Sequence, residues 1–300
     1  MKSSIILIFN PTAKGASGRK IVRASHFLKS SGYTVKVLFT EQKGHAESLA
    51  KDAIKESPSL IIAAGGDGTF NEVINGIAGS EVPMAILPLG TTNVLAKELG
   101  VPEDIESALE FALKNTPKTV SLGKISGIYE NQFTRHSSPV IRYFVLMAGI
   151  GFDGEAVRGV NEILKKFSGK GAYIYSGIKT LSRWKPNELF FNIDGKTYSG
   201  YTAIIGKAAK YGGNFRITPD ARLPEPFLYV CLFKGKSRLD ILSYAFGIVM
   251  GRHLRFKDVE YMKATTIEVK GNAHIQIDGD YFGKTPARVE IVPNIVRLIF

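Results

Sequence analysis

Short apolar runs alternate with helix-like patterns along the first 120 or so residues. Four continuous apolar runs are typical of buried parallel strands: Ile5–Phe9, Thr34–Phe39, Leu60–Ala64 and Met84–Leu87. Helical patterns lie between and after them, over Ser17–Ser30, Gly44–Glu56, Phe70–Ile77, Val94–Leu99 and Ile105–Leu113. Regular alternation of this kind predicts an α/β domain with an open parallel sheet and helices on both sides.

The pattern changes near Val120, and the remainder of the chain favours strands. We expect strands over Arg142–Ala148, Glu188–Ile193, Tyr198–Gly206, Leu228–Phe233, Thr265–Lys270, His274–Asp278 and Arg288–Val292, and helices over Glu162–Lys185 and Leu239–Gly251. Two Asp-Gly pairs suit two-residue hairpins, and the polar segment Ser126–Ile141 is expected to form a long hairpin tip. The second half therefore predicts an antiparallel, β-rich sandwich or barrel.

Two domains are expected, because 300 residues with 44% hydrophobic content can fill two ordinary cores. We place an α/β domain at residues 1–122, completed by the last apolar run at 295–300, and a β-rich domain at residues 123–294.

The formal net charge is +12, which attracts nucleotides or an anionic membrane surface. No nucleic-acid motif accompanies it, so a nucleic-acid partner is not expected. No apolar stretch reaches the roughly 20 residues of a membrane-spanning helix. The single cysteine, Cys231, suits a reducing cytoplasm, and we predict a cytoplasmic protein that associates peripherally with membranes. Helix Leu239–Gly251, followed by the basic segment Arg252–Lys257, either lies on an anionic membrane or packs over the sandwich.

The strongest chemical signal is the run Gly65-Gly-Asp67-Gly-Thr69-Phe-Asn71-Glu72, which follows an apolar strand and opens a helix. Glycines let phosphate oxygens approach backbone N–H groups, and a helix N-terminus adds positive partial charge. Asp67 and Glu72 offer carboxylates that act through Mg²⁺.

Two further loops follow the first and fourth expected strands, Asn10–Gly15 and Leu89–Asn93. Thr40 ends the second strand. Because the carboxyl ends of parallel strands share one edge of a sheet, we expect all of these segments to converge there.

These segments resemble the nucleotide-binding pattern of the diacylglycerol kinase catalytic domain superfamily, which includes soluble bacterial lipid kinases and eukaryotic sphingosine and ceramide kinases. The resemblance extends over nearly the whole chain and also includes Tyr143–Gly154, Gly169…Ala172-Tyr173 and Ile275–Pro286. It implies a fold like that of NAD kinase and phosphofructokinase, with ATP and Mg²⁺ in the cleft between the domains. A lipid hydroxyl at a membrane surface is the implied acceptor. The sequence leaves the lipid and the oligomeric state open, a homodimer included.

The resemblance also implies which residues contact ATP. They are Asn10, Pro11, Thr12, Ala13, Lys14, Thr40, Gly66, Asp67, Gly68, Thr69, Phe70, Asn71, Glu72 and Thr91. Asp67 would reach the nucleotide-bound Mg²⁺, and Lys14 or Arg19 would help to hold the phosphates.

The catalytic base of such kinases lies in an Asp-Gly-Glu segment of the second domain, which here is Asp278-Gly279-Asp280. We expect Asp278 to accept the proton of the lipid hydroxyl, with Asp280 as the second choice. Taken locally, an Asp-Gly pair after an apolar strand is also what a hairpin needs.

Besides Asp280, the chain departs from the family pattern at three places. Val94 and Ser121 stand where many bacterial relatives have aspartates that organise a metal–water network. A loop that holds a structural Mg²⁺ in some relatives keeps Glu225 as a ligand but has Pro226 in place of glycine, so this metal is not expected.

The sequence also allows one other interpretation of a motif and two other functions. Gly149–Gly154 matches a dinucleotide fingerprint, but it lies in the β-rich half, where a tight turn with a structural Asp153 is favoured. An NAD kinase-like enzyme shares the Gly-Gly-Asp-Gly core. A catalytically silent nucleotide- or lipid-binding regulator is the alternative from another class.

Overall fold

The computed structural model describes residues 3–130, 137–163 and 170–300. It divides into two compact units. The first comprises Met1–Ser121 together with Pro293–Phe300, and the second comprises Leu122–Val292.

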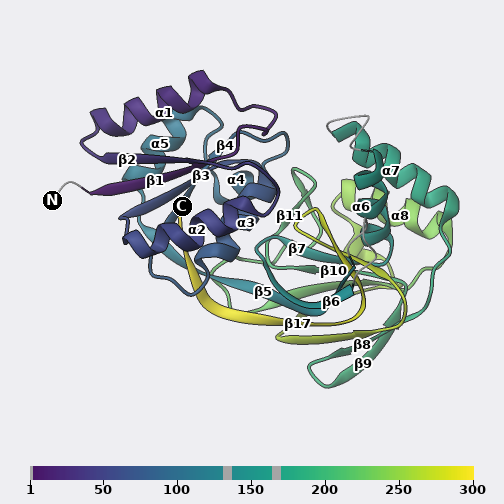
Figure 1. The fold of residues 1–300 in the computed structure, drawn as a ribbon. Helices are drawn as coiled ribbons and strands as arrows, with labels where there is room; N and C mark the ends of the chain where they lie inside the picture. The colour runs from purple at the N-terminus through teal and green to yellow at the C-terminus, as the bar shows by residue number, and fades with distance from the viewer. Residues whose placement is uncertain (1–2, 131–136, 164–169) are drawn as a thin grey trace. The chain divides into compact units, whose positions relative to one another are not determined.

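A parallel sheet forms the centre of the first unit (Figure 1). Its strands are β1 (Ser4–Phe9), β2 (Thr34–Phe39), β3 (Leu60–Gly65) and β4 (Met84–Pro88). The order is β4-β3-β1-β2, and every pair is parallel. The end of β17 (Asp280–Ile299) adds a fifth strand, because Leu298 pairs in parallel with Met84. The predicted fold class of this unit is confirmed.

Helices cover both faces of this sheet (Figure 1). They are α1 (Gly18–Ser30), α2 (His45–Ala53), the 3₁₀ turn η1 (Ile54–Glu56), α3 (Asp67–Ile77), α4 (Val94–Leu99) and α5 (Ile105–Lys114). Helix α1 packs with α5, and α2 packs with α3 on the opposite face. The chain therefore turns to opposite faces after the neighbouring strands β1 and β3. Such a topological switch point is where open α/β sheets bind ligands.

The second unit is antiparallel throughout its described strand pairs. Its strands are β5 (Pro117–Glu130), which begins in the first unit, β6 (Ser137–Phe144), β7 (Met147–Ile150), β8 (Leu189–Ile193), β9 (Lys196–Gly200), β10 (Thr202–Gly206), β13 (Leu228–Phe233), β14 (Val259–Ala264), β15 (Thr266–Lys270), β16 (His274–Ile277) and most of β17. A short hairpin of β11 (Lys210–Tyr211) and β12 (Phe215–Arg216) stands apart. Apolar side chains from these strands form one core that includes Phe144, Phe191 and Val230. The β-rich character predicted for this half is confirmed.

Both predicted Asp-Gly hairpins are present. Asp194 and Gly195 join β8 to β9, and Asp278 and Gly279 join β16 to β17. All four residues have positive φ, between 46° and 89°, as the favoured two-residue hairpin turns require. The hairpin of β5 and β6 extends to the pair Glu130 and Ser137, so most of the segment Ser126–Ile141, expected as a polar tip, is paired strand, and only residues 131–136 of it lie outside the described residues.

Three predicted elements differ from the structure. The expected strand Arg142–Ala148 breaks after Phe144, and the expected strand Tyr198–Gly206 breaks at Tyr201. The helix expected over Glu162–Lys185 corresponds to α7 (Lys170–Arg183), whereas α6 (Phe152–Ile163) begins ten residues before the expected helix and was not predicted. The first break has a direct cause, because a distant carboxylate binds the backbone amides that would otherwise continue the strand.

Helix α8 (Arg238–Val249) confirms the second predicted helix and is followed by the 3₁₀ turn η2 (His253–Arg255). Ser237 and Asp240 form a reciprocal capping box at its start. None of the helices in the described part of the chain has the length and apolar composition needed to cross a bilayer.

Candidate functional site

The loop after β1 is fastened to the helix after β3 by Asn10. The Asn10 side-chain oxygen accepts bonds from the N–H and hydroxyl of Thr12, at 2.9 and 2.8 Å. Its amide nitrogen donates to the Thr69 hydroxyl at 3.0 Å, and its backbone N–H donates to the Ala64 carbonyl. Pro11, Thr12 and Lys14 are left exposed. Asn10 thus shapes a loop whose exposed residues lie beside the start of α3.

The turn between β3 and α3 has no room for side chains. A Cβ on Gly65 would lie 2.5 Å from the Thr69 hydroxyl oxygen. Gly66 is the N-cap of α3 in an extended conformation, and no side chain caps the helix there. The first N–H groups of a helix need acceptors from outside it, and together with the helix dipole they favour an anion.

The loop after β4 lies directly against this turn. A Cβ on Gly90 would lie 2.6 Å from the Gly66 Cα, so the two glycines allow the backbones to touch. Leu89 links the three loops, since its N–H donates to the Gly65 carbonyl at 2.7 Å and its carbonyl accepts from the Gly15 N–H at 2.8 Å. Asn93, at φ 47°, closes the loop by bonding to both the N–H and the carbonyl of Gly90. The predicted convergence of the three loops is therefore observed.

Asp67 positions the helix that follows the third loop. Its two carboxylate oxygens accept the N–H groups of Val94 and Leu95, each at 3.0 Å, which caps the start of α4. Burial raises the pKa of the Asp67 carboxyl, while these two amides act in the opposite direction. Val94, one of the expected departures from the family pattern, thus takes part through its backbone N–H.

Glu72 holds the start of another helix in the same way. Its carboxylate accepts the N–H groups of Gly44 and Ala46, at 2.8 and 3.2 Å, at the start of α2. Thr40 is buried, with its N–H bonded to the Phe9 carbonyl, whereas Thr91 is exposed on the third loop. Phe70 and Asn71 are buried in α3, so neither side chain is open to solvent in this unit.

In the second unit, Asp278 holds the turn between β6 and β7. One carboxylate oxygen accepts the Val145 N–H, and the other accepts those of Leu146 and Met147, all at 2.9 Å. The Asp278 N–H donates in return to the Met147 carbonyl at 2.9 Å. These bonds interrupt the expected strand. Asp280 lies two residues further on and is half-buried at the start of β17.

The glycine-rich segment Gly149–Gly154 is built for close packing. Asp153 is 8% exposed and accepts bonds from the Tyr211 hydroxyl and, at 2.6 Å, from the Gln276 amide. A Cβ on Gly149 would lie 1.9 Å from an oxygen of this carboxylate. Both neighbours of β7 are antiparallel, so the strand–helix–strand unit of a dinucleotide site is missing here.

Glu225 accepts a bond from the Tyr229 hydroxyl at 3.0 Å. Within the described residues, no group of three or more His, Cys, Asp or Glu side chains is arranged to hold a metal ion. Ser121, the other departure from the family pattern, is fully buried, and its hydroxyl oxygen accepts the Asn294 N–H at 3.3 Å.

Comparison with known proteins shows which family the chain resembles. Residues 4–125 match the diacylglycerol kinase catalytic domain, and residues 147–300 match the YegS C-terminal NAD kinase beta sandwich-like domain. A diacylglycerol kinase of Bacillus subtilis (strain 168) is 30% identical over 293 residues, covering 93% of this chain and 90% of that protein. The chain belongs to the diacylglycerol kinase family. The family resemblance seen in the sequence, and with it the expectation of a lipid kinase, is confirmed.

Further relatives agree with this assignment. A diacylglycerol kinase of Staphylococcus aureus (strain JH9) is 30% identical over 295 residues and covers 96% of this chain and 89% of its own. The crystal structure of a diacylglycerol kinase from Bacillus anthracis str. Sterne has a TM-score of 0.73 at 22% identity, with 99% of this chain and 97% of that chain covered. At this level of identity the structural match establishes the fold alone.

Proposed function

We propose that the protein transfers the γ-phosphoryl group of Mg-ATP to a lipid hydroxyl, with diacylglycerol as the acceptor. The observation that supports this most strongly is the contact between Gly66 and Gly90 at the uncapped start of α3. Phosphoryl transfer depends mainly on positioning phosphates and neutralising their charge. Backbone N–H groups at a helix start supply both without a side chain.

The three loops would divide the nucleotide between them. The first-turn amides of α3, Gly68 and Thr69 among them, would bind phosphate oxygens. Lys14 is exposed on the loop after β1 and would add a cation, and Thr91 would add a hydroxyl from the loop after β4. The other predicted contacts, at Asn10, Pro11, Thr12, Ala13, Thr40, Phe70, Asn71 and Glu72, line or support the same loops.

Mg²⁺ in kinase sites is held largely by phosphates and water, with one or two carboxylates. Asp67 is the carboxylate nearest in sequence to the phosphate-binding amides, and its bonds to α4 leave it fixed in place. When bound with the nucleotide, Mg²⁺ would neutralise charge on the transferred group. The residues present therefore fit a metal that arrives with the nucleotide.

We assign the catalytic base to Asp280 and a positioning role to Asp278. The Asp278 carboxylate accepts three backbone N–H groups, and a proton added there would oppose those donors. A base must instead be able to take up the proton of the acceptor hydroxyl. This assignment reverses the order of preference drawn from the sequence.

The test is transfer of label from [γ-³²P]ATP to a panel of acceptors: diacylglycerol, phosphatidylglycerol, a sphingoid base and NAD. We expect label in the lipid phase, with diacylglycerol preferred. Labelled NADP would identify an NAD kinase instead. Nucleotide binding without transfer to any acceptor would indicate a silent regulator and would refute the proposal.

We also propose that α8 docks the enzyme on an anionic membrane, where its lipid acceptor resides. Ile241, Tyr244 and Gly247 are buried against the second unit. The outward-facing apolar residues Leu239, Leu242, Phe246 and Val249 are 73%, 51%, 67% and 58% exposed. Their spacing places them on one face of the helix. Both predicted roles of this helix are thus compatible, because it packs on one side and presents apolar side chains on the other.

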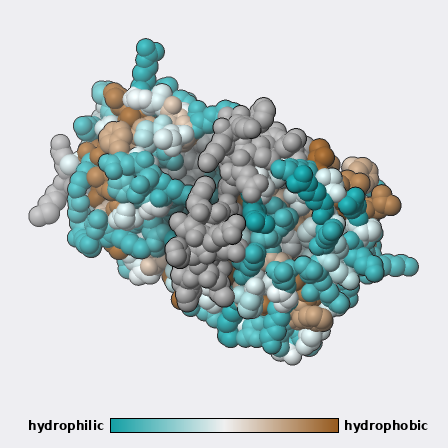
Figure 2. All heavy atoms as spheres, turned by 45° about the vertical axis from the view of Figure 1, so that its right-hand side comes forward, coloured by the Kyte–Doolittle hydropathy of each residue, from teal (hydrophilic) through white to brown (hydrophobic). Residues whose placement is uncertain are grey.

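Charge supports a membrane as the occupant of this face. Arg252, Arg255 and Lys257 are exposed just beyond the helix, and Lys236 and Arg238 are exposed at its start. An apolar face flanked by cations is typical of helices that lie at an anionic bilayer surface. In the view of Figure 2, hydrophobic atoms form small separate patches among largely hydrophilic atoms.

Substitution of Leu242 and Phe246 by serine tests the docking face. Full burial of such a side chain is worth roughly 1.5–3 kcal/mol. With 51% and 67% of these residues exposed, insertion of both would contribute about 2–3.5 kcal/mol, or at least about 30-fold in binding. We expect this loss in sedimentation with phosphatidylglycerol-containing vesicles. The control Val22→Ser with Phe190→Ser removes two other exposed apolar side chains and should bind normally. Equal loss in both pairs would contradict docking by α8.

A further inference from the structure

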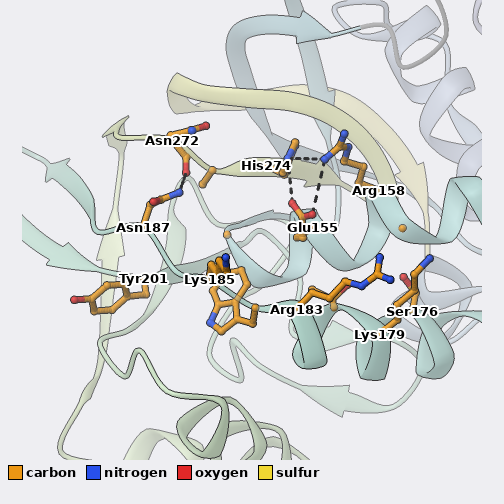
Figure 3. A pocket seen from close by; sticks show the side chains of 15 residues that line it. Glu155, Arg158, Ser176, Lys179, Arg183, Lys185, Asn187, Tyr201, Asn272 and His274 are labelled. Atoms are coloured by element: carbon orange, nitrogen blue, oxygen red, sulfur yellow. Dashed lines mark hydrogen bonds and ion pairs between the residues drawn. The ribbon is translucent and has the colours of Figure 1, made fainter.

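A cavity of about 410 Å³ lies wholly within the second unit. It is bounded by α6, α7, the segment that follows α7, and the start of β16 (Figure 3). None of the residues lining it belongs to the nucleotide-binding loops. Its size is within the range of ordinary small-ligand sites.

The lining of this cavity is strongly basic. It contains the cations Arg158, Lys179, Arg183 and Lys185 and a single acidic residue, Glu155. Lys179 and Arg183 project from the same helix, α7 (Figure 3). In the described part of the chain, no ion pair is formed by Lys179, Arg183 or Lys185. Cations gathered in one concave site repel one another unless an anion joins them.

The one acidic residue is already engaged. Glu155 lies 3.0 Å from the His274 ring nitrogen and 3.8 Å from the Arg158 guanidinium, and that guanidinium is 3.0 Å from the same ring nitrogen (Figure 3). These three side chains form a connected group at one side of the cavity. Glu155 is therefore engaged away from α7, and no described acidic side chain compensates the positive charge of Lys179 and Arg183.

The cavity also contains a hydrogen-bond donor that has no partner among the described residues. Trp184 lines it and packs edge-on against Phe152, with ring centroids 5.3 Å apart. Its indole N–H is buried, and no described residue accepts a bond from it. The Ser176 hydroxyl is already used to bond the Ala156 carbonyl at 2.6 Å. A ligand rich in acceptor oxygens would match this lining.

We propose that this cavity binds a phosphate-bearing anion, either the headgroup of an anionic phospholipid or a soluble phosphate ester. Guanidinium and ammonium groups form short, charge-assisted bonds with phosphate oxygens, and arginine binds them with two donors at once. The site goes beyond the proposed kinase reaction, which requires only ATP and an uncharged hydroxyl. It would let the enzyme sense anionic lipid through its second unit.

Trp184 is the only tryptophan in the chain, so its fluorescence reports on the cavity directly. The full-length protein, without ATP, is titrated with inorganic phosphate, with glycerol 3-phosphate, and with phosphatidylcholine vesicles that contain or lack phosphatidylglycerol. A saturable change with the two soluble phosphates identifies a site open to free phosphate esters. A saturable change with anionic vesicles alone identifies a lipid headgroup. Either result supports the proposal.

The variant Lys179→Gln with Arg183→Gln should weaken this binding roughly tenfold or more, because two charged hydrogen-bond donors are lost. Neither residue is buried, so the fold should persist, as a thermal melt will verify. The control Lys29→Gln with Lys196→Gln removes the same charge at two exposed sites outside the cavity and should bind as the wild type does.

Three results would overturn the proposal: no saturable change with any probe, equal weakening in both variants, or displacement of the bound phosphate by ATP, which would make the cavity a nucleotide site. Each can be distinguished from failure of the proposed function, because none of these measurements depends on phosphoryl transfer.

Discussion

Asp278→Asn tests the proposal that Asp278 is a structural carboxylate and that Asp280 is the catalytic base. In the protein, the Asp278 carboxylate accepts the N–H groups of Val145, Leu146 and Met147, each at 2.9 Å. The asparagine side chain keeps one oxygen and places an NH₂ group where the other oxygen accepted a bond. At least one backbone N–H group then faces the new NH₂ group, and the β6–β7 turn loses a hydrogen bond that holds it in place.

The expected cost follows from these bonds. A hydrogen bond to a charged group contributes about 1.5–3 kcal/mol, and one such bond is lost outright. For a domain of this size, each kcal/mol lowers the melting temperature by about 2–4 °C. Asp278→Asn should therefore melt about 3–12 °C below the wild type.

The assay compares thermal melts with the rate of diacylglycerol phosphorylation at a temperature where each variant is folded. We expect Asp278→Asn to retain measurable activity there, whereas Asp280→Asn should lose roughly a hundredfold or more, as removal of a general base does. The reasoning is refuted if Asp278→Asn melts like the wild type and yet loses as much activity as Asp280→Asn does. Asp278 would then be the base that the sequence first suggested.

Two further predictions concern the loops and acid stability. Gly90→Ala would place a Cβ 2.6 Å from the Gly66 Cα and force the two loops apart; we expect ATP affinity to fall at least about tenfold, while Gly18→Ala, where nothing lies within 4 Å, should bind ATP normally. Equal affinities in calorimetric titrations would contradict the packing argument. Burial lowers the pKa of His253, although its bond to the Ile217 carbonyl acts in the opposite direction, so the unfolded chain takes up the proton more readily. The stability from this residue is present above the ordinary histidine pKa of about 6.5 and is lost as the pH falls; His253→Gln keeps an N–H donor without titrating, and its urea midpoint should fall less between pH 7.5 and 5.5 than that of the wild type.

Local sequence signals were sufficient for most of the elements and for the convergence of the loops. The apolar run Leu60–Ala64 followed by Gly65 and Gly66 predicts a buried strand and a turn onto a helix, and the parallel sheet then brings that turn beside the Gly90 loop. Likewise, the Asp-Gly pairs that begin at Asp194 and Asp278 favour two-residue hairpin turns without help from distant residues. These features depend on neighbours in the chain, which the sequence displays directly.

Contacts between distant segments could not be read from the pattern. In the sequence Asp67 and Glu72 show only the pattern of metal ligands, but in the structure their carboxylates also accept the backbone N–H groups of Val94 and Ala46, which lie 27 and 26 residues away in the chain. Asp278 bonds to amides more than 130 residues earlier, which breaks a run that reads as one strand. In each case a carboxylate accepts hydrogen bonds from backbone N–H groups of a distant segment, and hydrophobic periodicity carries no signal of such contacts.

Helix α8 was ambiguous for a different physical reason. It is apolar on its buried face, at Ile241 and Tyr244, and also on its exposed face, at Leu242 and Phe246. Hydrophobic periodicity separates the two sides of a helix only when one side is polar. The basic cavity was missed because the segment that carries Lys179, Arg183 and Lys185 meets its other walls only in the folded chain, where Arg158 and His274 are in contact across 116 residues.

The central claim is that backbone amides at the start of α3 bind the phosphates of the nucleotide. Amide hydrogen exchange, measured with and without Mg-ATP, tests this directly. We predict slower exchange on nucleotide binding at residues 66–70 and in the neighbouring loop 90–93, with less change in the rest of the chain. If Mg-ATP binds and supports phosphoryl transfer while exchange in both loops is unchanged, the nucleotide lies elsewhere and the claim is wrong.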